Sequence, residues 1–265
     1  MKIATWNING IKARIENLRQ WLKDSNPDIA CLQEIKSIDE NFPRGEIEEL
    51  GYHLETHGQK GFNGVAILSK QTPDEVIRGL PGDDADEQSR FIEASFSIPG
   101  NRTLRVGCIY LPNGNPIDTE KYPYKLAWME RLQAFAAGRL ALEEPLILAG
   151  DYNVIPEPQD CFDPRVWAND ALFLPQTRQA FRRLENLGLT DALRATSDAA
   201  KLYTFWDYQA GAWPKNNGIR IDHLMLSPEA ADLMISAAVE KHVRAWEKPS
   251  DHVPVVAHFN FDKAA

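Results

Sequence analysis

Apolar, strand-like runs of this chain repeatedly end in side chains that are costly to bury. Asparagines, acids and a histidine stand at the ends of four such runs, and an aspartate opens a fifth run, IDHLMLS. At the edge of an apolar sheet these groups must be paired, hydrogen-bonded or bound to a metal. The residues are Asn7, Asn9, Glu34, Asp151, Asn153, Asp222, Asp251 and His252. The chain is therefore limited to folds that gather several strand ends in one place, which is where rigid scaffolds carry function.

Strand-like and helix-like segments alternate along the chain. Runs such as GVAILS, FIEASFSI and LRVGCIYL have the composition of strands, and turn-rich stretches such as LPGDDADEQS separate them. Residues 11–22 and 125–142 carry apolar side chains at helical spacing. IATWNIN and LILAGDYN both lead an apolar strand into an asparagine, which suggests two similar halves packed face to face. We predict a single α/β domain over residues 1–265, with two mixed sheets sandwiched between helices.

The charge of the chain argues against a protein that simply coats DNA. The formal net charge is −9, whereas phosphate contacts from cations supply most non-specific affinity for DNA. An enzyme needs only a local basic rim around its site, and bound metal ions can add positive charge there. Candidates for such a rim, each equally well explained as a scattered surface cation, are Lys36, Lys60, Arg90, Lys121, Lys125, Lys215 and Arg220.

The three cysteines, Cys31, Cys108 and Cys161, do not form a pattern typical of a disulfide scaffold or a zinc site. Cys31 and Cys108 lie in apolar runs, where buried thiols are expected. The N-terminal sequence MKIATWNING lacks the apolar region of a signal peptide, and no stretch is long and apolar enough for a membrane span. We therefore expect a cytoplasmic protein without membrane association.

Taken together, the polar residues at the strand ends fit a single kind of chemistry. Carboxylate and amide oxygens are the ligands that magnesium prefers. A histidine beside acids can protonate or neutralise a phosphoryl oxygen, and a further acid can orient or deprotonate water, which together support metal-assisted attack at phosphorus. Taken singly, each residue also has an ordinary explanation, such as a turn residue for Asn7 or a surface acid for Glu34. The chain contains neither GxSxG nor a P-loop, which argues against a serine hydrolase and an NTPase.

Six sequence blocks resemble the signatures of the endonuclease/exonuclease/phosphatase superfamily: TWNING, LQE, IYLPNG, GDYNV, RIDHLMLS and SDHVPV. Within it, the chain is most similar to the exonuclease III family of class II abasic-site endonucleases, from Lys2 to Phe259 and in the expected order. This resemblance implies a four-layer α/β sandwich with two mixed sheets packed face to face between helices. It also implies a DNA-repair hydrolase of phosphodiesters, which incises 5′ to abasic sites and acts as a 3′-to-5′ exonuclease that trims 3′ ends.

The resemblance further implies the cofactor, the partners and the metal site. The cofactor would be Mg²⁺ or Mn²⁺, and the substrate double-stranded DNA with abasic sites or 3′-blocked ends, bound by a monomer. Glu34 resembles the principal metal-binding carboxylate. The other residues that the resemblance assigns to the metal site are Asn7, Asn9, Asp151 and Asp251.

The resemblance assigns the chemistry to five side chains. Asp151 resembles the residue that activates or aligns the attacking water, and Asn153 its neighbour at the scissile phosphate. His252 resembles the group that contacts a phosphate oxygen, with Asp222 as its orienting carboxylate. Tyr110 resembles the tyrosine that contacts the phosphate and aids the leaving oxygen. Independently of the family, pairing with Asp222 is expected to raise the pKa of His252 and keep it charged near neutral pH.

Damage recognition is expected from a small apolar pocket. Phe205, Ile219 and Ile221 resemble the family positions that line it, although ordinary core residues would look the same. Ile219 and Ile221 share one face of an extended segment, so Arg220 is expected on the other face, in reach of backbone phosphate. Asn113, in IYLPNG, is a further expected DNA contact. By contrast, Trp6, Trp128 and Trp167 are expected in the core.

Two alternatives keep the fold and change the function. The same site could act as a phosphodiesterase or phosphatase on a non-DNA substrate, such as a lipid or an inositol phosphate. The WNING and GIRID blocks and the absence of a lipid-facing segment argue against this alternative. A non-catalytic binding module would need broken catalytic positions, and every matched position is intact.

Overall fold

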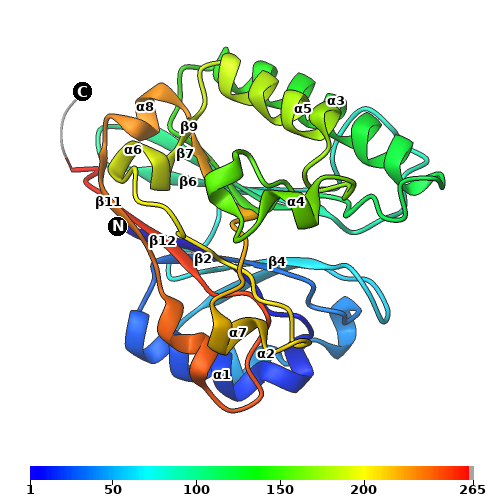
Figure 1. Cartoon of the computed structure of the whole chain (residues 1–265). Coiled ribbons are helices and arrows are strands. Elements are labelled where there is room, and N and C mark those ends of the chain that lie inside the picture. The colour runs from blue at the N-terminus through cyan, green and yellow to red at the C-terminus, as the bar shows by residue number, and fades with distance from the viewer. Residues whose placement is uncertain (263–265) are drawn as a thin grey trace.

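Two six-stranded mixed sheets pack face to face between helices (Figure 1) in residues 1–262, the part of the chain that this computed structural model describes. The first sheet has the order β11-β12-β1-β2-β4-β3. Its strands are β1 (Lys2–Asn7), β2 (Ile29–Gln33), β3 (His53–His57), β4 (Val65–Ser69), β11 (Met234–Val239) and β12 (Val255–Phe259). The second sheet has the order β5-β6-β7-β8-β10-β9. Its strands are β5 (Glu75–Arg78), β6 (Phe91–Ile98), β7 (Arg102–Tyr110), β8 (Leu146–Asp151), β9 (Thr190–Asp191) and β10 (Asp222–Leu226).

Helices cover the outer face of each sheet, which gives the four layers (Figure 1). The helices α1 (Ile11–Ser25) and α2 (Arg44–Glu48) lie outside the first sheet, and α3 (Lys121–Leu140) and α5 (Pro175–Asn186) outside the second. The shorter helices are α4 (Pro164–Trp167), α6 (Ala192–Thr196), α7 (Ala212–Lys215), α8 (Pro228–Ala231), η1 (Asp39–Asn41), η2 (Pro158–Asp160) and η3 (Lys241–Ala245). The predicted four-layer sandwich is confirmed, while a single domain over 1–265 stays a prediction.

The core has three layers, and this explains why several strands are apolar without alternation. The middle layer lies between the sheets and includes Cys31 and Cys108, as expected. One outer layer packs Trp6 and its neighbours under α1, and the other packs Trp128 of α3 against the second sheet. Strands such as β2, β4 and β8 are buried on both faces, so neither face needs to be polar. No helix in residues 1–262 is long and apolar enough to cross a membrane.

The register of the second sheet brings three of the predicted site residues to one edge. β7 and β8 are parallel, and Tyr110 at the end of β7 pairs with Asp151 at the end of β8. β10 is antiparallel to β8, so Asp222 at its start also faces Asp151. At this edge of the sheet, Asp151 therefore lies between a tyrosine on one neighbouring strand and an aspartate on the other.

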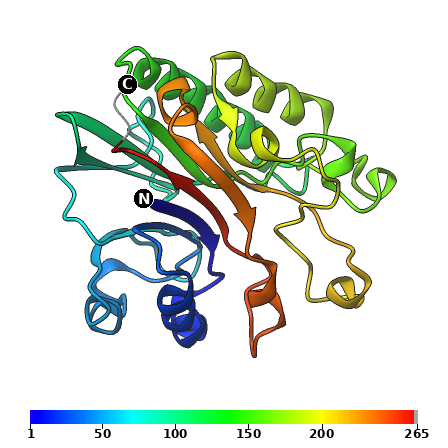
Figure 2. The same ribbon diagram turned by 90° about the vertical axis from the view of Figure 1, so that its left-hand side faces the viewer.

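The first sheet supplies the rest of the site from the same end of the sandwich. β1 and β2 are parallel, and Asn7 pairs with Gln33, directly before Glu34. β12 runs antiparallel to β1, so the residues before it, including His252, lie beside the end of β1. Figure 2 shows β1 in blue beside β12 in red, and β10 of the second sheet contacts both strands. The functional strand ends of both sheets thus meet across the sandwich.

Candidate active site

A buried histidine between two aspartates forms the centre of the site. His252 Nδ1 donates to Asp222 at 2.9 Å from Oδ2, and His252 Nε2 lies 3.8 Å from Asp151 Oδ2. The hydroxyl of Thr204 donates to Asp222 at 2.6 Å and holds this carboxylate in place. Burial alone would lower the pKa of His252, but Asp222 and then Asp151 outweigh it and raise this pKa to about 10. At neutral pH the ring is therefore an imidazolium whose Nε2–H is directed toward Asp151.

Asp151 is the carboxylate whose charge is least well compensated. Its pKa is raised to about 7, mainly by burial and further by the charge of Asp222, while His252 acts in the opposite direction. The side-chain amide of Asn7 and the backbone N–H of Asn153 each donate to it at 2.9 Å. A carboxylate whose pKa lies near the working pH is well suited to accept a proton from water.

Glu34 and Asp151 have the chemistry of a divalent-metal site. One ligand atom each from Glu34, Asp151 and His252 lie within 4.8 Å of one another. The two carboxylates fit a hard cation such as Mg²⁺, whereas a protonated His252 has no free lone pair for a metal. Burial would raise the pKa of Glu34, but hydrogen bonds from Asn7 and Lys36 and the charge of Lys36 outweigh it, so its pKa is lowered. The set thus fits a cation held by Glu34 and Asp151.

The asparagines predicted as metal ligands have a different arrangement from the one expected. Asn7 directs its NH₂ group between the two carboxylates, at 2.8 Å from Glu34 and 2.9 Å from Asp151. Asn9 lies next to them and its side-chain amide donates to Asp251 at 2.9 Å. Lys36 donates to the side-chain carbonyl oxygen of Asn9 at 2.5 Å. The structure therefore brings the predicted metal-site residues together, with Asn7 and Asn9 in hydrogen bonds that orient the acids.

The hydroxyl of Tyr110 interacts with the same two carboxylates. Burial, with the charges of Glu34 and Asp151, raises the pKa of its hydroxyl well above 10. The Arg90 guanidinium lies over the ring at 4.8 Å from its centroid. The phenol therefore stays protonated at neutral pH and can donate a hydrogen bond to a substrate oxygen.

One cavity of about 190 Å³ connects these polar groups with the predicted apolar residues. Phe205, Ile219 and Ile221 line it together with Glu34, Tyr110, Asn113, Asp151, Asn153, Asp251 and His252. Phe205 pairs through its backbone with both Ile219 and His252, so the apolar wall is connected directly to the histidine of the candidate site. The predicted pocket residues are thus next to the predicted catalytic residues.

Five residues that line the same cavity were not found by sequence reasoning: Asn115, Trp167, Asp170, Leu172 and Asp207. Trp167 was expected in the core, but it lies in α4 and is only partly buried against the small apolar cluster around Ile219. These residues come from loops and a four-residue helix, which have no periodicity to mark them. The one sequence signal near these residues was Asp163-Pro164, a pair typical of a helix start, which could have indicated the short helix that carries Trp167.

The prediction that Arg220 reaches DNA phosphate is wrong. Its side chain does point away from the pocket lined by Ile219 and Ile221, but it is 1% exposed and faces the interior. It donates to Asp160 at 2.7 Å and to Asp191 at 2.5 Å. The alternation of side chains along an extended segment predicted the direction of the Arg220 side chain. It did not predict that this side chain is buried, because both faces of the segment are covered.

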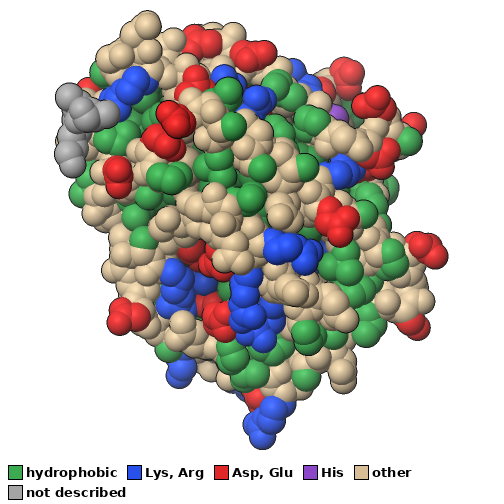
Figure 3. Space-filling model, turned by 90° about the horizontal axis from the view of Figure 1, so that it is seen from above, with side chains coloured by type: hydrophobic (Ala, Val, Ile, Leu, Met, Phe, Trp, Pro, Cys, Tyr) green, Lys and Arg blue, Asp and Glu red, His purple; other side chains and the backbone are tan. Residues whose placement is uncertain are grey.

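The predicted basic rim divides into exposed and buried members. Lys60, Lys121 and Lys215 are exposed, whereas Lys125 is fully buried and cannot reach DNA. Figure 3 shows acidic and basic side chains interspersed on the face seen from above, without a single basic stripe. This face of the molecule therefore offers no extended basic surface to DNA phosphate.

The fold and this site define a metal-dependent phosphoesterase, and comparison with known proteins specifies the family. Residues 4–252 match the Endonuclease/Exonuclease/phosphatase family. The exodeoxyribonuclease III of Haemophilus influenzae is 36% identical over 268 aligned positions, which cover 98% of this chain and 100% of that protein. The chain belongs to the Endonuclease/Exonuclease/phosphatase family. The resemblance to its exonuclease III members, and the prediction of a hydrolase of the nuclease type, are confirmed.

Solved structures give the same result. The 3′ phosphatase NExo from Neisseria, bound to a product DNA hairpin, is 38% identical with a TM-score of 0.94, over 98% of this chain and 99% of that chain. An AP endonuclease from Archaeoglobus fulgidus is 37% identical with a TM-score of 0.91, over the same shares of the two chains. Two similar folds thus belong to proteins with different named activities.

Proposed function

We propose that this chain is a DNA-repair phosphodiesterase that incises duplex DNA 5′ to abasic sites and trims 3′ ends. One observation carries this proposal: Asp151 and His252, which Asp222 holds by a hydrogen bond, line one cavity with the apolar wall of Phe205 and Ile219. An abasic nucleotide has no base to stack, so flipping it out of the helix costs less than flipping an intact nucleotide. The apolar wall of this cavity, which has a volume of about 190 Å³, suits a bare sugar.

The side chains divide the reaction between them. Asp151 accepts the proton of the attacking water or aligns it, and His252 donates Nε2–H to a phosphoryl oxygen as negative charge develops there. The protonated hydroxyl of Tyr110 donates to the phosphate or to the leaving oxygen. A divalent cation, which Glu34 and Asp151 would hold, supplies positive charge at the phosphate; we propose Mg²⁺ or Mn²⁺.

A duplex oligonucleotide with a single abasic analogue tests this function. We expect magnesium-dependent incision on the 5′ side of the analogue, and no cleavage in excess chelator until magnesium or manganese is added back. Cleavage that persists in excess chelator would contradict the metal mechanism. No cleavage of the abasic strand with either metal would contradict the proposed substrate.

A second activity, removal of 3′-blocking groups, is favoured by the similarity to the Neisseria 3′ phosphatase. Phe205→Ala distinguishes how much each activity depends on the apolar wall. We expect abasic incision to fall by more than 3′-phosphate removal, because only the former must recognise a sugar without a base. The control is thermal melting of the variant. Equal loss on both substrates, or a large fall in melting temperature, would make Phe205 a core residue.

We also propose that the protein acts as a monomer in the cytoplasm. The three thiols, at Cys31, Cys108 and Cys161, are all free and buried, which supports a reducing compartment. Size-exclusion chromatography with light scattering tests the monomer, and a mass corresponding to a dimer would contradict it.

A further inference from the structure

A lysine lies buried directly beneath the candidate active site without a carboxylate partner. Lys125, in the first turns of α3, is 0% exposed. Its ammonium donates to two backbone carbonyls, at 3.1 Å from Asn113 and 2.6 Å from Asn153, and no ion pair to it forms within residues 1–262. Burial lowers the pKa of this amine to about 7, although Asp151 and Asp170 favour the charged form. Folding stability alone would favour an apolar side chain of the same length here.

The two carbonyls belong to the loops that follow β7 and β8, and both loops carry asparagines of the site. Asn113 donates from its side chain to Asn153 Oδ1 at 3.1 Å, and Asn153 donates to the Leu111 carbonyl at 2.9 Å. Both asparagines line the cavity. Lys125 thus binds the backbone of the two residues whose side chains line the cavity.

The backbone around the lysine is unusual in two places. Asn153 has a φ of 47°, in the left-handed region that costs energy for any residue with a side chain. Gly114, at φ +90°, passes so close that a Cβ there would lie 2.7 Å from Cδ of Lys125. The loop after β7 is therefore built tightly over the lysine stem, and the loop after β8 is held in a conformation that needs support from its surroundings.

We propose that Lys125 is a positioning residue for the phosphate subsite, which fixes Asn113 and Asn153 toward one substrate oxygen. This inference rests on the proposed function, because the oxygen belongs to the phosphodiester. Removing the ammonium should misplace both asparagines in the transition state, so it should lower kcat more than it raises KM.

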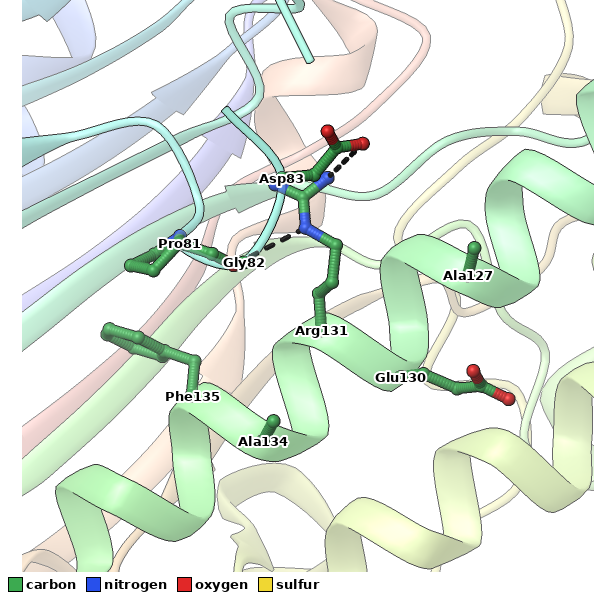
Figure 4. Close-up of a pocket in the computed structure, with 8 residues that line it drawn as sticks. All are labelled: Pro81, Gly82, Asp83, Ala127, Glu130, Arg131, Ala134 and Phe135. Carbon is green, nitrogen blue, oxygen red and sulfur yellow. Dashed lines mark hydrogen bonds and ion pairs between the residues drawn. The ribbon is translucent and has the colours of Figure 1, made fainter. Parts of the chain in front are cut away.

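Lys125→Met removes the charge and the donors and keeps the length of the side chain. Arg131→Met is the matched control, since Arg131 lies two turns later on α3 and also binds backbone carbonyls, those of Leu80 and Pro81. Figure 4 shows Arg131 reaching across to the loop of Pro81, Gly82 and Asp83. This loop does not line the catalytic cavity. The control therefore removes a second cation from the same helix, one that also forms an ion pair with Asp86 at 2.8 Å, without touching the site.

We expect Lys125→Met to lower kcat by about tenfold or more, since small misplacements of reacting groups can cost about a hundredfold, and to melt at or above the wild-type temperature. Arg131→Met should melt lower and keep its kcat. Unchanged kcat in Lys125→Met overturns the inference. So does a loss of kcat accompanied by a fall in melting temperature as large as that of Arg131→Met.

A second variant keeps the test decisive if methionine disturbs the fold. Lys125→Ala leaves a cavity, and ethylammonium should restore part of its activity, whereas tetramethylammonium, which has no N–H, should not. Equal effects of the two ions overturn the inference. Rates are measured on the abasic duplex and on bis(p-nitrophenyl) phosphate. Wild-type cleavage of only the simple diester would refute the proposed substrate and would still measure the role of Lys125.

Discussion

Two clusters of buried charged side chains share strand β10 and differ in their balance of charge. Asp222 belongs to one cluster, and the next residue, His223, belongs to the other. The catalytic cluster consists of Glu34, Asp151, Asp222 and His252, and the structural cluster of Asp160, Asp191, Arg194, Arg220 and His223. In the structural cluster burial would raise the pKa of each aspartate, but Arg220 outweighs it and lowers both. In the catalytic cluster the pKa of Asp151 is raised to about 7.

The difference shows how to distinguish buried charges that hold a fold together from buried charges that act. In the structural cluster two arginines face two aspartates, so the carboxylates are satisfied within the protein. The catalytic cluster has three carboxylates against one imidazolium, with Lys36 at its edge. The remaining negative charge is what a divalent cation would neutralise. Perturbed pKa values of this kind mark functional sites.

Asp151→Asn should give the largest loss of activity and also a gain in stability. Loss of the carboxylate should reduce kcat by at least about a hundredfold and leave DNA binding intact. In metal-free protein the variant should melt higher than wild type, because an ionised and poorly compensated carboxylate is removed. Asp191→Asn is the matched control, and it should melt lower with kcat retained. If the two variants shifted the melting temperature in the same direction, the two clusters would not differ in how well their carboxylates are compensated.

His252→Ala should reduce kcat by about a hundredfold, and Asp222→Ala should reproduce part of that loss. Asp222 acts through the ring that it orients, so the double variant should be little worse than His252→Ala. Steady-state kinetics of the two single variants and the double variant measure this coupling. Losses that simply multiply would show that the two residues act independently.

The two clusters should also respond to pH in opposite directions. The folded-state pKa of Asp191 lies below its unfolded value of about 3.9, so the stability it contributes is present above that value and is lost as pH falls through the folded pKa. The pKa of Asp151 is raised to about 7, so its stabilising contribution is present at low pH and is lost as pH rises toward 7. In metal-free protein, the melting advantage of Asp151→Asn over wild type should therefore grow between pH 4 and pH 7. An advantage that stays constant over this range would be evidence against the raised pKa.

Arg220→Met should have the smallest effect on catalysis and a large effect on stability. The change leaves buried Asp191 without its arginine and Asp160 with Arg194 alone, which should cost about 3–5 kcal/mol. Urea unfolding measures that loss, and kcat at a temperature where the variant is folded should stay close to wild type. A fall in kcat comparable to that of Asp222→Ala, in folded protein, would mean that the structural cluster also takes part in catalysis.

The sequence predicted the residues of the catalytic cluster but not the residues that support them. Glu34, Asp151 and His252 were identified because polar groups at the ends of apolar strands need a chemical reason. Lys125 and Arg220 were expected at the surface, since charged side chains are rarely buried. Their partners, two loop carbonyls and two aspartates from other segments, are distant in the sequence or have no side-chain signature.

The sequence by itself determined the alternation of strands and helices, the two-sheet architecture and the set of residues predicted to carry the chemistry. These features follow from local periodicity and from motifs, both of which are encoded in neighbouring residues. Only the tertiary structure decided that the Asn7 amide bridges two carboxylates, that Trp167 and Leu172 line the cavity, and that Arg220 faces the interior. The physical reason is that burial and charge balance depend on which distant segments come together, and these determine the pKa of each group and the surface it can reach.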